Sequence, residues 1–213
     1  MIENLATEAV GLLAQILFSG RMIVQWVMSE RARKVVSPVI FWQMSMAASF
    51  LLCIYGWLGS DLVIILGQTL SYYIYIWNLD AKGSWRRMHV VLRWLFIMLP
   101  VVAGGWLMLF HRNEAFARLI TDTGIAPALF VYGIAGQAVF SLRFVYQWIY
   151  SSRRGESVLP KGFWIISIAG SCLIIPYAII RCKWAYLLGQ ITGAAVYARN
   201  LMIAAAANRA GED

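Results

Sequence analysis

Two pairs of polar residues with the same spacing lie inside long apolar stretches of the chain. Arg21 and Gln25 stand in the phrase FSGRMIVQW. Arg143 and Gln147 stand in the similar phrase FSLRFVYQW. Residues four positions apart share one face of an α-helix. A guanidinium group binds phosphate or carboxylate through two parallel hydrogen bonds. The pairs therefore predict a site for an anionic headgroup, such as the phosphate or diphosphate of a lipid-linked sugar.

Two other interpretations of the arginines remain open at this point. An arginine at membrane depth costs about 3 kcal/mol or more, so it is usually paired, functional or extended toward the interface. Arg21 and Arg143 lie a turn or two from the ends of their apolar stretches, so they could extend to lipid phosphates and water. They could also bond neighbouring helices. No Asp or Glu lies well inside an apolar stretch, so the sequence offers no evident carboxylate partner.

The elements that must position these residues are membrane-spanning helices. Of the 213 residues, 61% are hydrophobic and 13% are charged, whereas a soluble domain carries about a quarter charged residues. The apolar blocks are about as long as a bilayer is thick and lack the period-two alternation of a membrane β-barrel. The sequence predicts an all-α membrane protein with seven spans, near 8–28, 38–58, 61–79, 90–110, 126–150, 161–180 and 184–204.

The basic residues indicate an orientation in the membrane. They lie in short segments that flank the predicted spans, which is typical of membrane topology and not of a nucleic-acid surface. With the N-terminus outside, eleven Lys and Arg residues fall on the cytoplasmic side. The opposite side receives four, namely Arg112, Arg118, Arg181 and Lys183. We therefore expect a multi-pass protein of the bacterial inner membrane with its N-terminus outside, its C-terminus in the cytoplasm and no nucleic-acid partner.

The doubled phrase belongs to a longer internal repeat. A shift of 122 residues aligns 11–79 with 133–201 without a gap. Each copy contains three predicted spans, and one span between them has no counterpart. Three spans reverse the direction of the chain and the fourth restores it, so the copies are parallel, as in one class of transporter folds. The predicted domains are a first triple-helix repeat, a linker with the fourth span and a second triple-helix repeat, at 1–82, 83–123 and 124–213.

The repeated motifs resemble those of a known family. Each copy contains FSxRxxxQW, a Phe-Trp pair after a proline, LGQ and a Y-x-x-N-L ending. These motifs are similar to the bacterial lipid-A biosynthesis N-terminal domain family, and the 3+1+3 arrangement resembles the SWEET and PQ-loop transporters. The resemblance implies two parallel triple-helix bundles joined by a linker helix. Val24 and Tyr146 stand where PQ-loop proteins carry a proline.

Further candidate residues accompany this resemblance. In SWEET proteins a polar amide on the third helix of each bundle faces the sugar, which implies that role for Gln68 and Gln190. The alternative is that these amides bond neighbouring helices. Trp42 and Trp164 begin the second spans, where an anchor in the headgroup region is favoured over stacking on a sugar ring. The full set of candidate substrate-binding residues is Arg21, Gln25, Arg143, Gln147, Gln68, Gln190, Gln15, Gln137, Trp42 and Trp164.

The predicted function is that of a membrane carrier. His89 and His111 lie at opposite ends of one span, and enzyme or metal motifs are missing from the sequence. No catalytic residue, metal or cofactor is therefore expected. We predict a transporter or flippase-like carrier of a polyprenyl-phosphate-linked sugar or related glycolipid for lipid A or envelope glycans. The alternatives are a non-transporting subunit that presents the lipid to a membrane glycosyltransferase, and a SWEET-like facilitator of soluble sugars.

Overall fold

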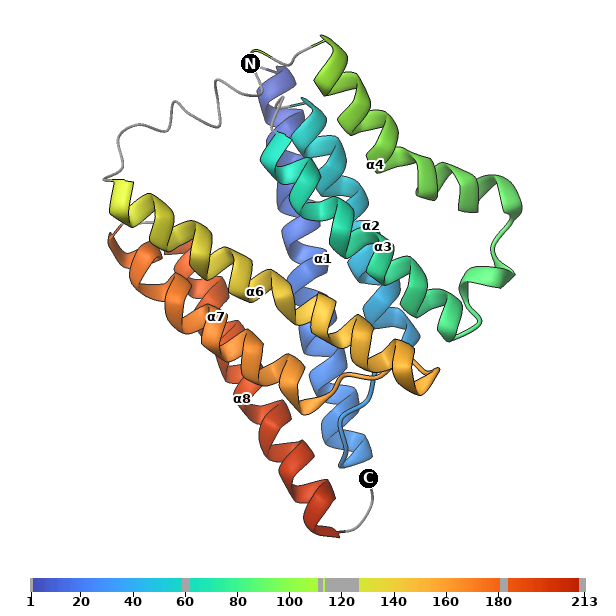
Figure 1. The fold of residues 1–213 in the computed structure, drawn as a ribbon, viewed down its shortest axis with the longest axis vertical. Coiled ribbons are helices and arrows are strands. Elements are labelled where there is room, and N and C mark those ends of the chain that lie inside the picture. Colours follow the sequence, from blue (N-terminus) through green and yellow to red (C-terminus); the bar gives the residue numbers. More distant parts are fainter. Residues whose placement is uncertain (1, 59–61, 111–112, 114–126, 181–183, 211–213) are drawn as a thin grey trace. The chain divides into compact units, whose positions relative to one another are not determined.

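The computed structural model describes residues 2–58, 62–110, 113, 127–180 and 184–210. Within these ranges the chain forms seven α-helices and one short 3-10 helix, which confirms the predicted all-α class (Figure 1). In chain order these are α1 (Ile2–Ala32), α2 (Val39–Leu58), α3 (Leu62–Ala81), η1 (Trp85–Arg87), α4 (Val90–Phe110), α6 (Pro127–Arg154), α7 (Lys161–Ile180) and α8 (Trp184–Ala210).

Over the described residues, four helices are long and apolar enough to cross a membrane. They are α1 from Ala9 to Ala32, α2, α4 and α7. Helices α2 and α7 each have 20 residues, which corresponds to about 30 Å, the thickness of the hydrocarbon core. The chain is therefore a multi-pass membrane protein. The four cationic residues expected on the outer side, and His111, lie outside the described residues.

The contacts divide the chain into two units, each described by itself. The first unit comprises residues 1–21 and 42–124, and the second comprises residues 22–41 and 125–213. In the first unit α3 packs against η1 and α4, and in the second α7 packs against both α6 and α8 (Figure 1). The division falls within α1 and again near the start of α2. The three predicted domains follow the sequence repeat, so they are a different division of the chain.

The first helix of each repeat ends in the same left-handed turn. Arg33 has a φ of 55° and Gly155, which is 122 residues later, has a φ of 72°. The Arg33 N–H donates to the Glu30 carbonyl at 3.2 Å, and the Gly155 N–H donates to the Ser152 carbonyl at 3.3 Å. Glycine adopts this conformation without steric cost, whereas a side chain there costs about 1 kcal/mol or more.

Arg33→Gly is therefore expected to raise the free energy of unfolding by about 1 kcal/mol, because it removes this steric cost. Gly155→Ala is expected to lower the free energy of unfolding by a similar amount. The measurement is unfolding of the purified protein in detergent. Arg31→Gly is the matched control, since it places glycine within α1 and should destabilise by about 1 kcal/mol. Equal stability of Arg33→Gly and Arg31→Gly would contradict this account of the turn.

Helices α6 and α7 approach each other closely at Gly170. A Cβ atom on Gly170 would lie 2.7 Å from the Cα atom of Phe140. Backbone atoms cannot move aside as the tip of a side chain can, so this contact requires glycine. Small residues at helix contacts allow such close packing in membranes. The contact fixes Phe140, and the ring of Phe140 lies beside one of the two predicted arginines.

Candidate functional site

Arg21 lies inside the first unit and connects three helices. Its side chain is only 4% exposed. Its Nη1 donates hydrogen bonds to the Ser45 hydroxyl on α2 at 2.6 Å and to the Tyr75 hydroxyl on α3 at 3.3 Å. Its guanidinium carbon lies 4.5 Å from the ring centroid of Phe18 and 5.6 Å from that of Tyr75. The cation is thus held by two hydroxyl groups and two aromatic rings.

Arg143 lies inside the second unit and is surrounded by aromatic rings. Its side chain is 7% exposed. The guanidinium carbon lies 3.4 Å from the ring centroid of Phe140, 4.8 Å from Phe144, 5.8 Å from Tyr197 and 5.9 Å from Phe163. These rings come from α6, α7 and α8. A cation over an aromatic ring gains about 0.5–2 kcal/mol, more where water is excluded.

The two arginine sites reproduce each other through the repeat. Phe18 and Tyr75 in the first site correspond, at the offset of 122, to Phe140 and Tyr197 in the second. Ser167, the counterpart of the Ser45 that accepts a hydrogen bond from Arg21, donates to the Phe163 carbonyl within α7. Both arginine side chains are buried among helices in the structure, whereas an arginine that extends to lipid phosphates and water would be exposed.

The two predicted anchor tryptophans are buried. Trp42 and Trp164 are each 0% exposed. The ring of Trp42 lies 6.0 Å from that of Tyr75, and the ring of Trp164 lies 6.0 Å from that of Tyr197. The expectation of an anchor in the headgroup region is therefore wrong. Burial of a large apolar ring against a tyrosine is the stronger effect here, and each indole supports the tyrosine beside an arginine.

Gln25 is fully buried and holds the loop after α1. Its Nε2 donates to the Ser29 hydroxyl at 2.8 Å, the Val36 carbonyl at 3.3 Å and the Asn200 side-chain oxygen at 2.9 Å. The Val36 N–H in turn donates to the Ser29 hydroxyl at 3.1 Å. The amide therefore connects α1, its following loop and α8.

Gln147 forms the corresponding contacts at the end of α6. Its Nε2 donates to the Ser151 hydroxyl at 2.9 Å and to the Val158 carbonyl at 2.9 Å. The Val158 N–H donates to the same hydroxyl at 3.1 Å. Each repeat thus uses one glutamine and one serine to close the loop between its first and second helices. The structure places both glutamines at these loops and both arginines one turn earlier.

An ion pair without a counterpart lies beside Gln25. Arg199 on α8 binds the Glu30 carboxylate through its Nε and Nη2, with 2.9 Å between Nη2 and Oε2. The Trp26 indole also donates to Glu30 at 2.9 Å. At the offset of 122, Ser152 replaces the glutamate and Trp77 replaces the arginine. The repeat therefore carries this ion pair once.

In each repeat the glutamine on the third helix forms a hydrogen bond with the second helix. The Ser49 hydroxyl donates to Gln68 Oε1 at 2.8 Å, and the Ser171 hydroxyl donates to Gln190 Oε1 at 2.9 Å. Of the two interpretations left open for Gln68 and Gln190, these contacts match the interhelical one. Gln15 and Gln137 are exposed on α1 and α6. Among the residues described, no three His, Cys, Asp or Glu side chains are grouped to hold a metal ion.

Sequence reasoning did not assign the residues that hold the arginines. Tyr75, Tyr197, Phe18 and Phe140 all contact an arginine in the structure. The signal was present, because both tyrosines and both phenylalanines are identical across the repeat. The neighbours of the arginines were indicated by the occurrence of the same residue at the matching positions of both copies. Residue type alone would not have indicated them.

Comparison with known proteins identifies the repeated region. The Lipid A Biosynthesis N-terminal domain matches residues 10–80 and again residues 132–202. A lipid-A-disaccharide synthase of Chlamydia felis is 28% identical over 178 residues, which are 80% of this chain and 28% of that protein. Lipid-A-disaccharide synthases of Chlamydia muridarum and Chlamydia pneumoniae are 27% and 28% identical over 78% and 79% of this chain.

The chain spans less than a third of the length of these relatives, 28% or 29% in each case. No solved structure matches it. The two matched segments cover the two copies of the repeat, with Arg21 in the first and Arg143 in the second. This chain belongs to the Lipid A Biosynthesis N-terminal domain family, whose domain it carries twice.

Proposed function

We propose that the protein is a membrane carrier for a phosphorylated, lipid-anchored sugar used in lipid A or envelope glycan assembly. In this proposal Arg21 and Arg143 bind the phosphate of the headgroup. The observation that carries it is the pair of buried arginines, one in each unit, each with its guanidinium carbon within 6 Å of matching phenylalanine and tyrosine rings. A polyprenyl-phosphate-linked sugar and a phosphorylated lipid A disaccharide both present the required anion.

The energetics of buried arginine support a binding role. An arginine in a membrane interior costs several kcal/mol by most measures, and apolar side chains can often replace buried charges without loss of stability. Both repeats nevertheless contain the arginine. Aromatic rings close to the guanidinium group stabilise its charge through cation–π interactions. The N–H groups along its edge are the ones that bind phosphate in a bidentate manner.

The proposal includes a topology. We propose seven spans arranged as 3+1+3, related to the SWEET and PQ-loop folds, with α4 as the linker helix between two parallel repeats. The distribution of basic residues supports an N-terminus outside and a C-terminus in the cytoplasm of a bacterial inner membrane. In such a carrier the helices around the arginines separate to admit the headgroup. When the helices close again, both arginines are buried.

A second candidate function is a non-enzymatic subunit that presents the lipid to a glycosyltransferase. The lengths of the relatives favour it, since in lipid-A-disaccharide synthases this region is joined to a much longer chain. A module that binds the glycolipid in the membrane would then supply substrate to a catalytic part that lies elsewhere. Both candidates require phosphate binding, and they differ in movement across the bilayer.

The test is a transfer assay in proteoliposomes with a fluorescent polyprenyl-phosphate-linked sugar. A membrane-impermeant quencher outside the vesicles removes the fluorescence of lipid in the outer leaflet. If the protein is a carrier, lipid from the inner leaflet should become accessible to the quencher faster than in protein-free vesicles. Binding to the protein without accelerated transfer would favour the presenting subunit. Transport of a neutral free sugar, without binding of the phosphorylated lipid, would reject both candidates in favour of a soluble-sugar facilitator.

A further inference from the structure

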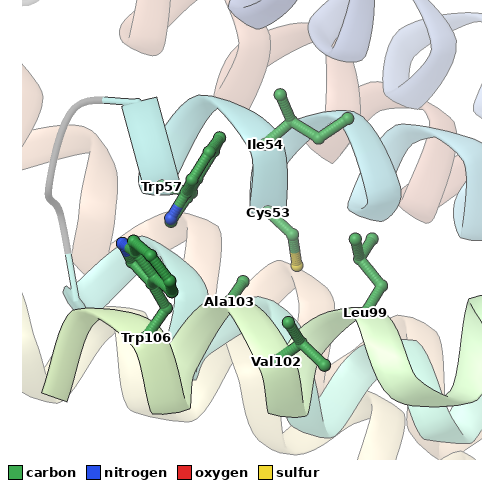
Figure 2. A pocket seen from close by; sticks show the side chains of 7 residues that line it. All are labelled: Cys53, Ile54, Trp57, Leu99, Val102, Ala103 and Trp106. Atoms are coloured by element: carbon green, nitrogen blue, oxygen red, sulfur yellow. The ribbon is translucent and has the colours of Figure 1, made fainter. Parts of the chain in front are cut away.

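An apolar cavity of about 210 Å³ lies between α2 and α4 in the first unit. Figure 2 shows Cys53 and Trp57 on the α2 side and Leu99, Ala103 and Trp106 on the α4 side, with the two tryptophans together at one end. All of the lining side chains are apolar apart from the thiol and indole groups. An apolar cavity of about 150 Å³ in a soluble protein stays dry and binds hydrocarbon, so this larger one is suited to a hydrocarbon chain.

The cavity opens on the surface that membrane lipid covers. Helix α4 is one of the candidate membrane spans, and few of its residues are buried. Trp57, Val102 and Trp106 line the cavity and are also exposed. Pro100 removes a backbone hydrogen bond within α4 and bends the helix (Figure 1). Pro100 stands in the sequence between Leu99 and Ala103, which both line the cavity.

A cluster of cations lies at the other end of α4. Arg86 donates to the Asp80 carboxylate at 2.9 and 3.1 Å and holds the pKa of that carboxyl below its usual range. Lys82, Arg87 and Arg93 lie in the same segment, so four cations accompany one carboxylate. Within the described part of the chain, the buried Nε atom of Arg93 has no hydrogen-bond partner. Basic clusters next to a span bind anionic lipid headgroups.

The distance between the cations and the cavity fits one lipid. Leu99 follows Arg93 by six residues, which corresponds to about 9 Å along a helix, and Trp106 follows it by thirteen, about 20 Å. Half of the hydrocarbon core is about 15 Å thick. An acyl chain attached to a headgroup at Arg93 is therefore long enough, along the axis of α4, to reach the cavity.

We propose that this cavity binds one acyl chain of an anionic membrane phospholipid whose phosphate contacts Arg87 and Arg93. This lipid is separate from the glycolipid of the proposed function, because its cavity lies between α2 and α4 and is lined by neither Arg21 nor Arg143. The lipid holds the linker helix α4 against α2. Few residues of α4 are buried by the protein itself, so contacts with a lipid would add to its packing.

The test is native mass spectrometry of the protein released from nanodiscs of phosphatidylglycerol or phosphatidylcholine. The wild type is expected to retain one phosphatidylglycerol molecule. Ala103→Phe fills the cavity and should reduce retention about tenfold, as expected when roughly two methylene groups lose their contacts. Val101→Phe adds the same ring to an exposed position of α4 and should retain the lipid. Arg87→Gln with Arg93→Gln should abolish the preference for phosphatidylglycerol.

A second measurement does not depend on the folding of any variant. Phosphatidylglycerol with a photoreactive group near the end of its acyl chain is expected to crosslink to the peptides of Cys53 and Trp106 in the wild type. Crosslinks confined to the outer face of α4 around Val101, or equal retention by Ala103→Phe and Val101→Phe, would overturn the proposal. Retention of phosphatidylglycerol after replacement of Arg21 and Arg143 separates this site from that of the proposed function.

Discussion

Arg143→Met is expected to reduce the affinity of the protein for a phosphorylated glycolipid by about 10- to 100-fold, because hydrogen bonds to a charged group contribute about 1.5–3 kcal/mol. Methionine has a similar length and packs well against aromatic rings. The rings of Phe140 and Phe144, which contact the guanidinium group in the structure, should accept it. The second unit should therefore remain folded while phosphate binding is lost. Binding of a fluorescent glycolipid in nanodiscs measures the first effect and unfolding in detergent measures the second.

Two comparisons make this prediction sharper. Arg143→Lys keeps the charge but loses the planar, bidentate group, so it should recover only part of the affinity. Arg21→Met should also lower affinity, and in addition it should destabilise the first unit by about 1–3 kcal/mol. The reason is that Ser45 and Tyr75 lose a buried donor. Full affinity in both methionine variants would show that the arginines serve packing alone.

Gln25→Leu is expected to lower the free energy of unfolding by about 2–4 kcal/mol. Its amide donates to the Val36 carbonyl and to the Asn200 side chain. Each buried acceptor left without a donor costs about 1–3 kcal/mol. The loop after α1 should also become more susceptible to protease cleavage, since the amide is one of the groups that hold it. Thermal and denaturant unfolding in detergent measure the loss.

Gln15→Leu is the matched control for this substitution. It makes the same chemical change on the same helix, but Gln15 is exposed, so stability should change by less than about 0.5 kcal/mol. Combining Gln25→Leu with Asn200→Leu should cost less than the sum of the single changes, because the two side chains share one hydrogen bond. Additive costs would mean that this hydrogen bond does not stabilise the folded state.

The sequence predicted the helices well because their limits depend on local chemistry. A proline precedes α2 and another precedes α7, and the Phe41 and Phe163 N–H groups donate to the carbonyls of these two prolines. The repeat also predicted which contacts would recur, as the matching neighbours of Arg21 and Arg143 show. These features depend on residue identity and spacing, and both are visible in one chain.

The inward or outward direction of a side chain was harder to predict. Helices α2 and α7 are apolar over most of their length and carry few polar side chains apart from serines, so their sequences indicate only weakly how either helix is rotated. Trp42 and Trp164 were therefore expected at the membrane interface, although they are buried. The Glu30–Arg199 ion pair joins residues 169 positions apart, one in each copy of the repeat. It has no counterpart at the offset of 122, so neither local spacing nor the repeat could have indicated it.

The central claim is that the repeated arginines bind the phosphate of a glycolipid. The most direct measurement compares the affinities of the wild-type protein for a phosphorylated glycolipid and for the same lipid without its phosphate. The account predicts that the phosphorylated lipid binds at least about tenfold more tightly, and that this preference disappears when Arg21→Met and Arg143→Met are combined. Equal affinity of the wild type for the two lipids would contradict the account.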